Sequence, residues 1–259
     1  MSKRIFLVAG GYLPGYKSGG PIRAIVNIVD WLGDDYQFFI MALDRDTGDT
    51  APYPNVNVGE WQQVGKAQVL YTPMRQLTIW QWRDALLSQK RNAIFQAWID
   101  LRSWRVAGKL GPLFESAATR DKLKPAAIWE IERGRALPLA RIEEASAVRS
   151  AFYRAMLRLF DRFDALVMPS AQIFPFDVTL DWPAEVAGRP MDTYHRWMET
   201  VVPASLLGLP AIALPAGFSP SGLPAGFQVI GRPRDDLGVL RLAKAYERAT
   251  DWLARAPEL

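Results

Sequence analysis

The chain has 259 residues, a formal net charge of +4 and a pI of about 9.4, with 49% hydrophobic and 22% charged residues. This globular balance argues against a largely disordered chain, and the length suffices for one large α/β domain or two small ones. Lys and Arg are scattered along the sequence, so we expect no nucleic-acid partner. The absence of Cys excludes disulfides, thiolate metal sites and a Cys nucleophile.

The first residues superficially resemble a signal peptide, because two basic residues precede a short apolar run. That run meets Gly10-Gly11 at once and is too short for the apolar region of a secretory signal. No stretch of the sequence is long and apolar enough to span a bilayer. We therefore expect a cytoplasmic protein with no membrane partner, which the absence of Cys suits.

The N-terminal residues predict a β–loop–α–β unit. Residues 4–9 form an apolar run typical of a buried parallel strand, and a Gly- and Pro-rich loop follows over residues 10–21. Apolar residues then recur at helical spacing, with Pro21 suited to the first turn and Gly33 to the C-cap. A second strand at residues 36–43 completes the first piece of a Rossmann-like sheet.

The remainder of the chain alternates between helical and strand patterns. We expect a hairpin at 61–71, helices at 77–87, 93–106, 139–163, 194–207 and 237–253, and strands at 165–168, 211–214 and 226–230. Pro203 must kink or split the helix that contains it. A polar patch at residues 89–92 interrupts the apolar periodicity, so we divide the chain into domains 1–90 and 91–259.

The Gly-rich loop before the first helix is one candidate site. Backbone N–H groups at the start of a helix attract phosphate, and Gly19 and Gly20 would let a ligand approach closely. The loop matches neither the dinucleotide-binding GxGxxG pattern nor the P-loop pattern. A phosphate or acceptor site and a tight structural turn both remain consistent with it.

Residues 12–24, Tyr-Leu-Pro-Gly-Tyr-Lys-Ser-Gly-Gly-Pro-Ile-Arg-Ala, resemble the start of retaining GT-B glycosyltransferases of family four. Blocks at 44–49, 52–54 and 59–61 extend the resemblance over about residues 3–88. It implies half of a Rossmann domain that meets the acceptor, with the Gly-rich loop near the phosphates of the donor. The second Rossmann domain, which binds most of the donor in that family, has no counterpart after residue 90.

From about residue 95 to 253 the chain resembles the C-terminal part of amidase-signature hydrolases. The most specific run is Gly-Leu-Pro-Ala-Gly-Phe-Gln-Val-Ile-Gly at residues 222–231, and further blocks lie at 123–125, 128–130, 164–170, 191–197, 208–211 and 215–218. The resemblance implies an α/β sheet domain in a family that hydrolyses C–N amide bonds. It also implies substrate-adjacent positions for Ser170, Tyr194, His195 and Gln228, although plain packing accounts for each as well.

In that family the catalytic serines and lysine lie in an N-terminal half, and this chain has no Gly-Gly-Ser-Ser-Gly run. Ser18 is a poor substitute because an unactivated hydroxyl is a weak nucleophile. His195 is the only histidine, so a Ser-His-Asp triad would have to use it, and a zinc site is disfavoured. We therefore predict no catalytic residue, no metal and no cofactor.

The expected fold class is α/β, with a partial Rossmann-like unit followed by the C-terminal part of an amidase-signature sheet domain, as in a chimera of two truncated pieces. The leading functional hypothesis is a weakly active or inactive amidase relative that binds a small amide-like molecule. The alternatives are a glycosyltransferase-like acceptor- or nucleotide-binding module and a non-catalytic interaction protein. Incomplete sheets leave unpaired edges and apolar faces, so we also expect self-association.

Overall fold

A computed structural model describes residues 3–16, 20–46, 49–73, 91–186, 188–219 and 221–252. The chain forms two compact units, one made of Met1–Gln81 with Leu157–Leu259 and the other of Trp82–Met156. We call them the sheet unit and the helical unit. The helix expected at 77–87 lies outside the described residues.

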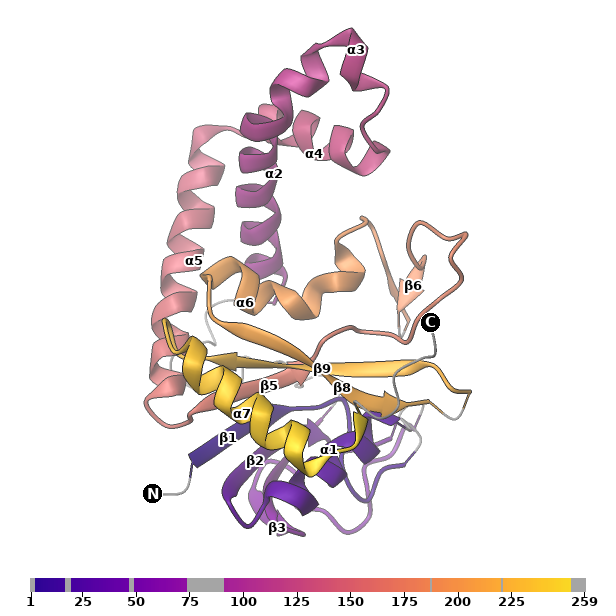
Figure 1. Cartoon of the computed structure of the whole chain (residues 1–259), viewed down its shortest axis with the longest axis vertical. Helices are drawn as coiled ribbons and strands as arrows, with labels where there is room; N and C mark the ends of the chain where they lie inside the picture. Colours follow the sequence, from indigo (N-terminus) through magenta and orange to yellow (C-terminus); the bar gives the residue numbers. More distant parts are fainter. Residues whose placement is uncertain are drawn as a thin grey trace. The chain divides into compact units, whose positions relative to one another are not determined.

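The sheet unit is built on a seven-stranded mixed sheet with the order β3-β4-β2-β1-β5-β9-β8 (Figure 1). Its strands are β1 Lys3–Val8, β2 Tyr36–Leu43, β3 Trp61–Val64, β4 Ala67–Thr72, β5 Ala165–Pro169, β8 Ala211–Phe218 and β9 Pro224–Gly231. The strands β1, β2, β4 and β5 are parallel, whereas β3 pairs antiparallel with β4, and β9 pairs antiparallel with both β5 and β8. A separate small ladder joins β6 Glu185–Val186 to β7 Arg189–Pro190.

Strand β1 joins the N-terminal and C-terminal segments of the chain in one sheet. It pairs with β2 on one side and with β5 on the other, where residues 5–7 lie opposite residues 165–167. The β–loop–α–β unit expected from the sequence is therefore confirmed, but its strands belong to the same sheet as the amidase-like segment. The domain division at residue 90 stays a prediction, because residues 74–90 lie outside the described part of the chain.

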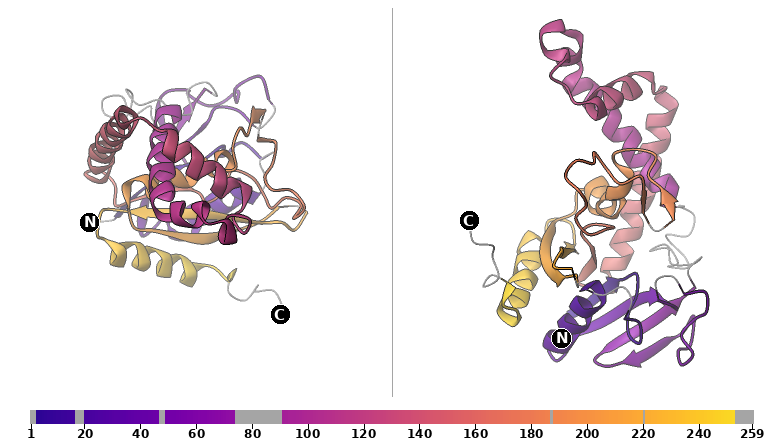
Figure 2. Two further views of the ribbon diagram at one scale, coloured as in Figure 1. Left: turned by 90° about the horizontal axis from the view of Figure 1, so that it is seen from above. Right: turned by 90° about the vertical axis from the view of Figure 1, so that its right-hand side faces the viewer.

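The two faces of this sheet carry different elements. Helices α1 Gly20–Leu32 and α7 Asp236–Ala249 cover one face, and α6 Val202–Leu207 lies on the opposite side of β8 and β9 from α7 (Figures 1 and 2). Beneath α1 and α7, side chains from both ends of the chain form one apolar core, which includes Ile5, Ile28, Val69, Val167, Val229 and Leu242. The hydrophobic burial that stabilises the sheet unit is thus shared by both segments.

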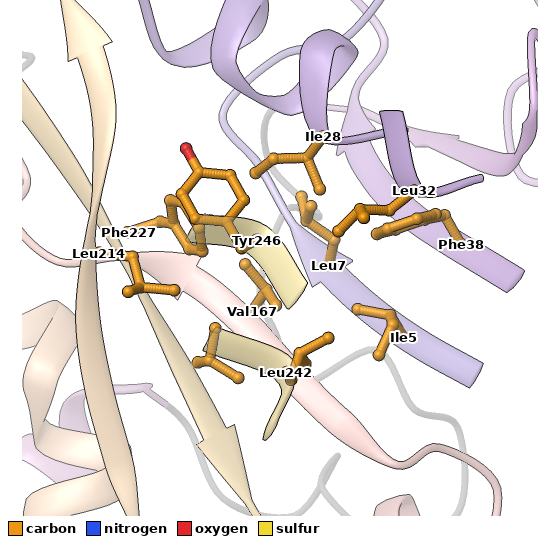
Figure 3. Close-up of a pocket in the computed structure, with 11 residues that line it drawn as sticks. Ile5, Leu7, Ile28, Leu32, Phe38, Val167, Leu214, Phe227, Leu242 and Tyr246 are labelled. Atoms are coloured by element: carbon orange, nitrogen blue, oxygen red, sulfur yellow. The ribbon is translucent and has the colours of Figure 1, made fainter. Parts of the chain in front are cut away.

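A small cavity of about 20 Å³ lies within this core (Figure 3). Its lining is apolar and comes from β1, α1, β2, β5, β8, β9 and α7, with Leu7, Val167 and Leu242 among its residues. A void of this size has room for about one water, and water needs polar partners that this lining lacks. The cavity is a packing defect where the two segments meet, and it is too small for a substrate.

The helical unit contains α2 Arg91–Glu115, α3 Ala117–Arg120, α4 Pro125–Ala136 and most of α5 Leu139–Phe160. The buried carboxylate of Asp100 in α2 accepts hydrogen bonds from Gln96, from Arg133 of α4 and from Arg141 of α5. One buried charge therefore ties three helices together, with cationic partners that offset its desolvation. In neither unit does a described helix have the length and apolar character needed to cross a membrane.

Two proline-containing segments differ from the sequence-based expectation. Helix α2 continues through Pro112 to Glu115, although the proline has no N–H to donate to the carbonyl four residues before it. The helix expected at 194–207 is split into a 3-10 helix, η1 Arg196–Val201, and α6. Pro203 lies in the first turn of α6, where its missing N–H would have had no helical partner.

Candidate functional site

The carboxyl end of β5 and the segment after it hold most of the residues singled out in the sequence. Strand β9 runs antiparallel beside β5, with Gln228 opposite Met168. The Ser170 N–H donates a 3.1 Å hydrogen bond to Gly226 O, so the pairing continues past the end of β5. Because side chains alternate along a strand, Ser170 and Gln228 point to the same face of the sheet.

Gly226 makes room for the Ser170 side chain. A Cβ at position 226 would lie 2.6 Å from Ser170 Oγ, well inside van der Waals contact. On the same face of the sheet, Ala213 and Pro215 of β8 lie opposite Gln228 and Gly226 and are exposed. The half-buried hydroxyl of Ser170 therefore borders a surface of small side chains.

Gln228 holds the end of β5 against η1. Its side chain is 5% exposed, and Nε2 donates hydrogen bonds to Pro169 O at 3.1 Å and to Thr200 O at 2.9 Å. No described residue donates to its Oε1, which keeps its capacity as an acceptor. Gln228 thus both positions the backbone at the site and presents an amide oxygen.

A second glutamine, which sequence reasoning missed, fixes the other end of η1. Gln172 Nε2 donates a 2.8 Å hydrogen bond to Arg196 O. Gln172 lies just beyond the amidase-like block that ends at Ser170, and nothing in its neighbourhood marks it as an anchor. The two glutamines together hold η1 over the carboxyl end of β5.

Tyr194 and His195 precede η1 and differ in exposure. His195 is 2% exposed, whereas Tyr194 is 38% exposed. Their rings are almost perpendicular, with centroids 5.3 Å apart, and Trp182 contacts the Tyr194 ring edge-on with a centroid separation of 6.1 Å. His195 therefore packs as part of the interior, and Tyr194 offers an accessible aromatic ring supported by Trp182.

Charged side chains around η1 neutralise one another. Arg196 donates two hydrogen bonds, of 2.9 and 3.0 Å, to the Asp192 carboxylate, and this bidentate pair lowers the pKa of Asp192 below its ordinary value. Arg189 donates a 2.7 Å hydrogen bond to the buried carboxylate of Glu199. The segment consequently presents no isolated charge from these four side chains.

Several polar atoms of the same segment are buried but make no hydrogen bond within the described part of the chain. They are Thr193 Oγ1, Trp197 Nε1 and Thr200 Oγ1. Native interiors leave few such atoms unpaired, since each costs free energy unless water or a ligand satisfies it. Thr193, Trp197 and Thr200 therefore have hydrogen-bonding capacity that no described residue uses.

The lysines and the acidic and histidine side chains of the described residues make the following contacts. None of the described lysines donates a hydrogen bond to a serine hydroxyl; Lys66 binds Asp30 and Asp34, and Lys244 binds Glu247. No group of His, Asp and Glu side chains within those residues could hold a metal ion. At the other candidate site, Gly20 is the first residue of α1, and Gly19 lies outside the described residues, so the phosphate site stays a prediction.

The amidase family model matches residues 105–240, more than half of the chain. The chain belongs to the amidase family. The match spans β5, η1 and β9, and therefore contains Ser170, Tyr194, His195 and Gln228.

Related sequences agree with this assignment. The chain is 36% identical over 115 residues to the A subunit of glutamyl-tRNA(Gln) amidotransferase from Myxococcus xanthus, a match that covers 44% of this chain and 22% of that protein. It is 37% identical over 120 residues to the same protein from Thermodesulfovibrio yellowstonii, which covers 46% of this chain and 24% of the relative. These matches thus span about a quarter of the length of the amidase relatives.

Solved structures show the same fold over almost the whole chain. A bacterial aryl acylamidase of the amidase signature family matches 98% of this chain and 44% of its own with a TM-score of 0.65 at 19% identity. A 6-aminohexanoate cyclic dimer hydrolase matches 99% of this chain and 47% of its own with a TM-score of 0.63 at 18% identity. The likeness to amidase-signature folds therefore includes the N-terminal segment.

The glycosyltransferase resemblance of residues 3–88 has no counterpart in these matches. The amidase family model begins at residue 105, and none of these four relatives is a glycosyltransferase. The resemblance stays a prediction from the sequence.

Proposed function

We propose that this member of the amidase family binds a small amide-like molecule beside the carboxyl end of β5 and hydrolyses it poorly. The observation that carries the proposal is the position of Ser170 and Gln228. Both lie within the amidase match, on one sheet face, with a hydroxyl and an amide oxygen that make no hydrogen bond to described residues. A carboxamide ligand can accept from the first and donate to the second.

The surroundings of this pair support a neutral, partly apolar ligand. Tyr194 supplies an exposed ring, and the Asp192–Arg196 and Arg189–Glu199 pairs leave little net charge nearby. Binding sites for small molecules commonly combine apolar walls with a few placed polar groups. The polar atoms of Thr193, Trp197 and Thr200, which make no hydrogen bond to described residues, add hydrogen-bonding capacity to the same segment.

Weak turnover follows from the lack of a described base beside the Ser170 hydroxyl. Ser170 is the hydroxyl at this position, and no described lysine or histidine makes a hydrogen bond to it. A serine hydroxyl at its ordinary pKa needs an adjacent base to attack an amide carbonyl. Catalysis by such a site is limited to holding the substrate.

The proposal is tested by measuring binding and hydrolysis separately. Benzamide binding to the whole chain is measured by calorimetry, and hydrolysis of 4-nitroacetanilide by release of the coloured aniline. We expect saturable benzamide binding that weakens in Ser170→Ala, together with hydrolysis close to the buffer rate in both proteins.

Two results would contradict this function. Absence of benzamide binding at millimolar concentration would show that the site does not bind small amide-like molecules. Hydrolysis well above the buffer rate that disappears in Ser170→Ala would show that the serine is an activated nucleophile. Ser146→Ala is the matched control, because Ser146 is exposed in α5 and its hydroxyl donates to the helix backbone at Ile142 O.

A further inference from the structure

The strand order of the sheet unit reverses between β1 and β5. From β1 the chain passes through α1 to β2 on one side, whereas from β5 it continues to β9 and β8 on the other side. β1 and β5 are adjacent and parallel, so their carboxyl ends lie at the same edge of the sheet. In α/β sheets ligands bind outside the carboxyl ends of strands at such a switch point.

The residues that follow β1 and β5 lie at this edge of the sheet. Leu7 lies opposite Val167 in the last pair of this ladder, β1 ends at Val8 and β5 ends at Pro169, so Gly10 and Ser170 each follow the carboxyl end of one of two neighbouring parallel strands. Gly10 is exposed, and a Cβ built on it would meet no atom within 4 Å. A residue from the loop after β1 and the residue that carries the hydroxyl of the amide site thus both follow strands that end at the same edge of the sheet.

We infer that Gly10 and Ser170 form two sides of one composite binding site for a neutral carboxamide, built jointly by the N-terminal and amidase-like segments. The inference rests on the proposed function and extends its site to a residue outside the amidase match. The open space at Gly10 lets a ligand lie against the backbone after β1 while it bonds to Ser170 and Gln228.

The chemical class of the ligand follows from the polar groups at this edge of the sheet. Gly10 and Gly11 offer backbone amides, Ser170 offers a hydroxyl and Gln228 offers a side-chain amide, and none of these residues carries a charge. Neutral groups of this kind favour a ligand with both a donor and an acceptor over an anion, whose desolvation they offset poorly. Benzamide and benzoate have the same shape and differ in charge, so comparing them distinguishes a site for a neutral amide from a site for an anion.

The chain has no Cys, so a single introduced thiol reports on one position. The test follows the rate at which 4,4′-dithiodipyridine, a neutral reagent, modifies the Gly10→Cys variant with benzamide, benzoate or inorganic phosphate present. Gly108→Cys is the matched control, because Gly108 of α2 has the same open space around it. Thermal melting of both variants against the parent checks that each remains folded.

We expect benzamide at about four times its Kd to slow modification of Gly10→Cys about fivefold, because only the unoccupied protein reacts. Benzoate and phosphate leave that rate unchanged, and no ligand changes the rate of Gly108→Cys. Adding Ser170→Ala to the Gly10→Cys variant abolishes the protection by benzamide.

The possible results distinguish failure of the composite site from failure of the proposed amide binding. If the parent binds benzamide but Gly10→Cys is not protected, the amide site does not reach β1 and the composite site is wrong. Protection by phosphate in place of benzamide would identify an anion site and overturn the assignment of a neutral ligand. If the parent binds no benzamide and no ligand protects Gly10→Cys, both proposals fail.

A Gly10→Leu variant, which fills the same space, should lose benzamide binding while keeping the parent's melting temperature.

Discussion

Arg4 and Asp164 exchange two hydrogen bonds although 160 residues separate them. The Arg4 N–H donates to Asp164 Oδ2 at 2.7 Å, and the Asp164 N–H donates to Arg4 O at 2.7 Å. This reciprocal pair fixes the first residues of β1 beside the start of β5, at the end of the sheet away from Ser170. It clamps the N-terminal segment to the amidase-like segment.

Removing the carboxylate of Asp164 is expected to destabilise the sheet unit. Asp164→Ala deletes a charge-assisted hydrogen bond and leaves the Arg4 N–H unpaired, at a cost of about 1–3 kcal/mol. Urea unfolding of the whole chain measures the loss as a lower midpoint with unchanged slope. Asp161→Ala, at an exposed neighbouring position, should change stability by less than about 0.5 kcal/mol.

Gln228→Ala is expected to loosen the site as well as the fold. The change leaves the carbonyls of Pro169 and Thr200 without their side-chain donor, which costs roughly 2–4 kcal/mol for two part-buried hydrogen bonds. Hydrogen exchange of η1 should accelerate, and benzamide affinity should fall. Gln62→Ala removes an exposed hydrogen bond to Asn57 O and serves as the control, with little expected effect on either measurement.

The core beneath α7 provides a comparison of two leucines on one helix. Leu242 is 9% exposed and lines the cavity, whereas Leu240 is 55% exposed. Leu242→Ala enlarges the existing void and should cost about 3–5 kcal/mol, while Leu240→Ala should cost less than about 0.5 kcal/mol. Equal losses in urea unfolding would show that Leu242 of α7 does not pack against the sheet.

Buried tyrosines should make the fold sensitive to high pH. Burial raises the pKa of Tyr53, Tyr71 and Tyr246 from 10.0 to about 12. The unfolded chain then loses these protons first, so their contribution to stability is full below about pH 10 and is lost as pH rises towards about 12. Urea midpoints measured across that window should fall steadily. In Tyr246→Phe the urea midpoint should fall less steeply with pH, even though the change also removes the hydrogen bond to Pro215 O.

Local signals in the sequence predicted most elements of the fold. The apolar runs of β1, β2 and β5, the turn at Gly65-Lys66 and the apolar spacing of α1 are all properties of neighbouring residues. The pairing of β1 with β5 was not predictable in this way, because no property of either strand specifies a partner so distant in sequence. For that reason the sequence suggested two separate pieces where the structure has one sheet.

From the sequence, only those site residues were predictable that lie within a recognisable motif. The run at residues 222–231 led to Gln228, and its register then explains why Gly226 faces Ser170. Gln172 and the open position at Gly10 depend on backbone geometry, which becomes visible only when the strands are placed side by side. The expectation of self-association stays a prediction from the sequence.

The central claim is that residues from both ends of the chain form one cooperative sheet unit. Hydrogen exchange of the whole chain, read by mass spectrometry as urea is increased, tests it directly. Cooperative units open together, so amides of β1, β2, β5 and β9 should show one opening free energy and one dependence on urea. If the amides of β1 and β2 instead exchange at low urea while those of β5 and β9 stay protected, the two segments fold independently and the claim is wrong.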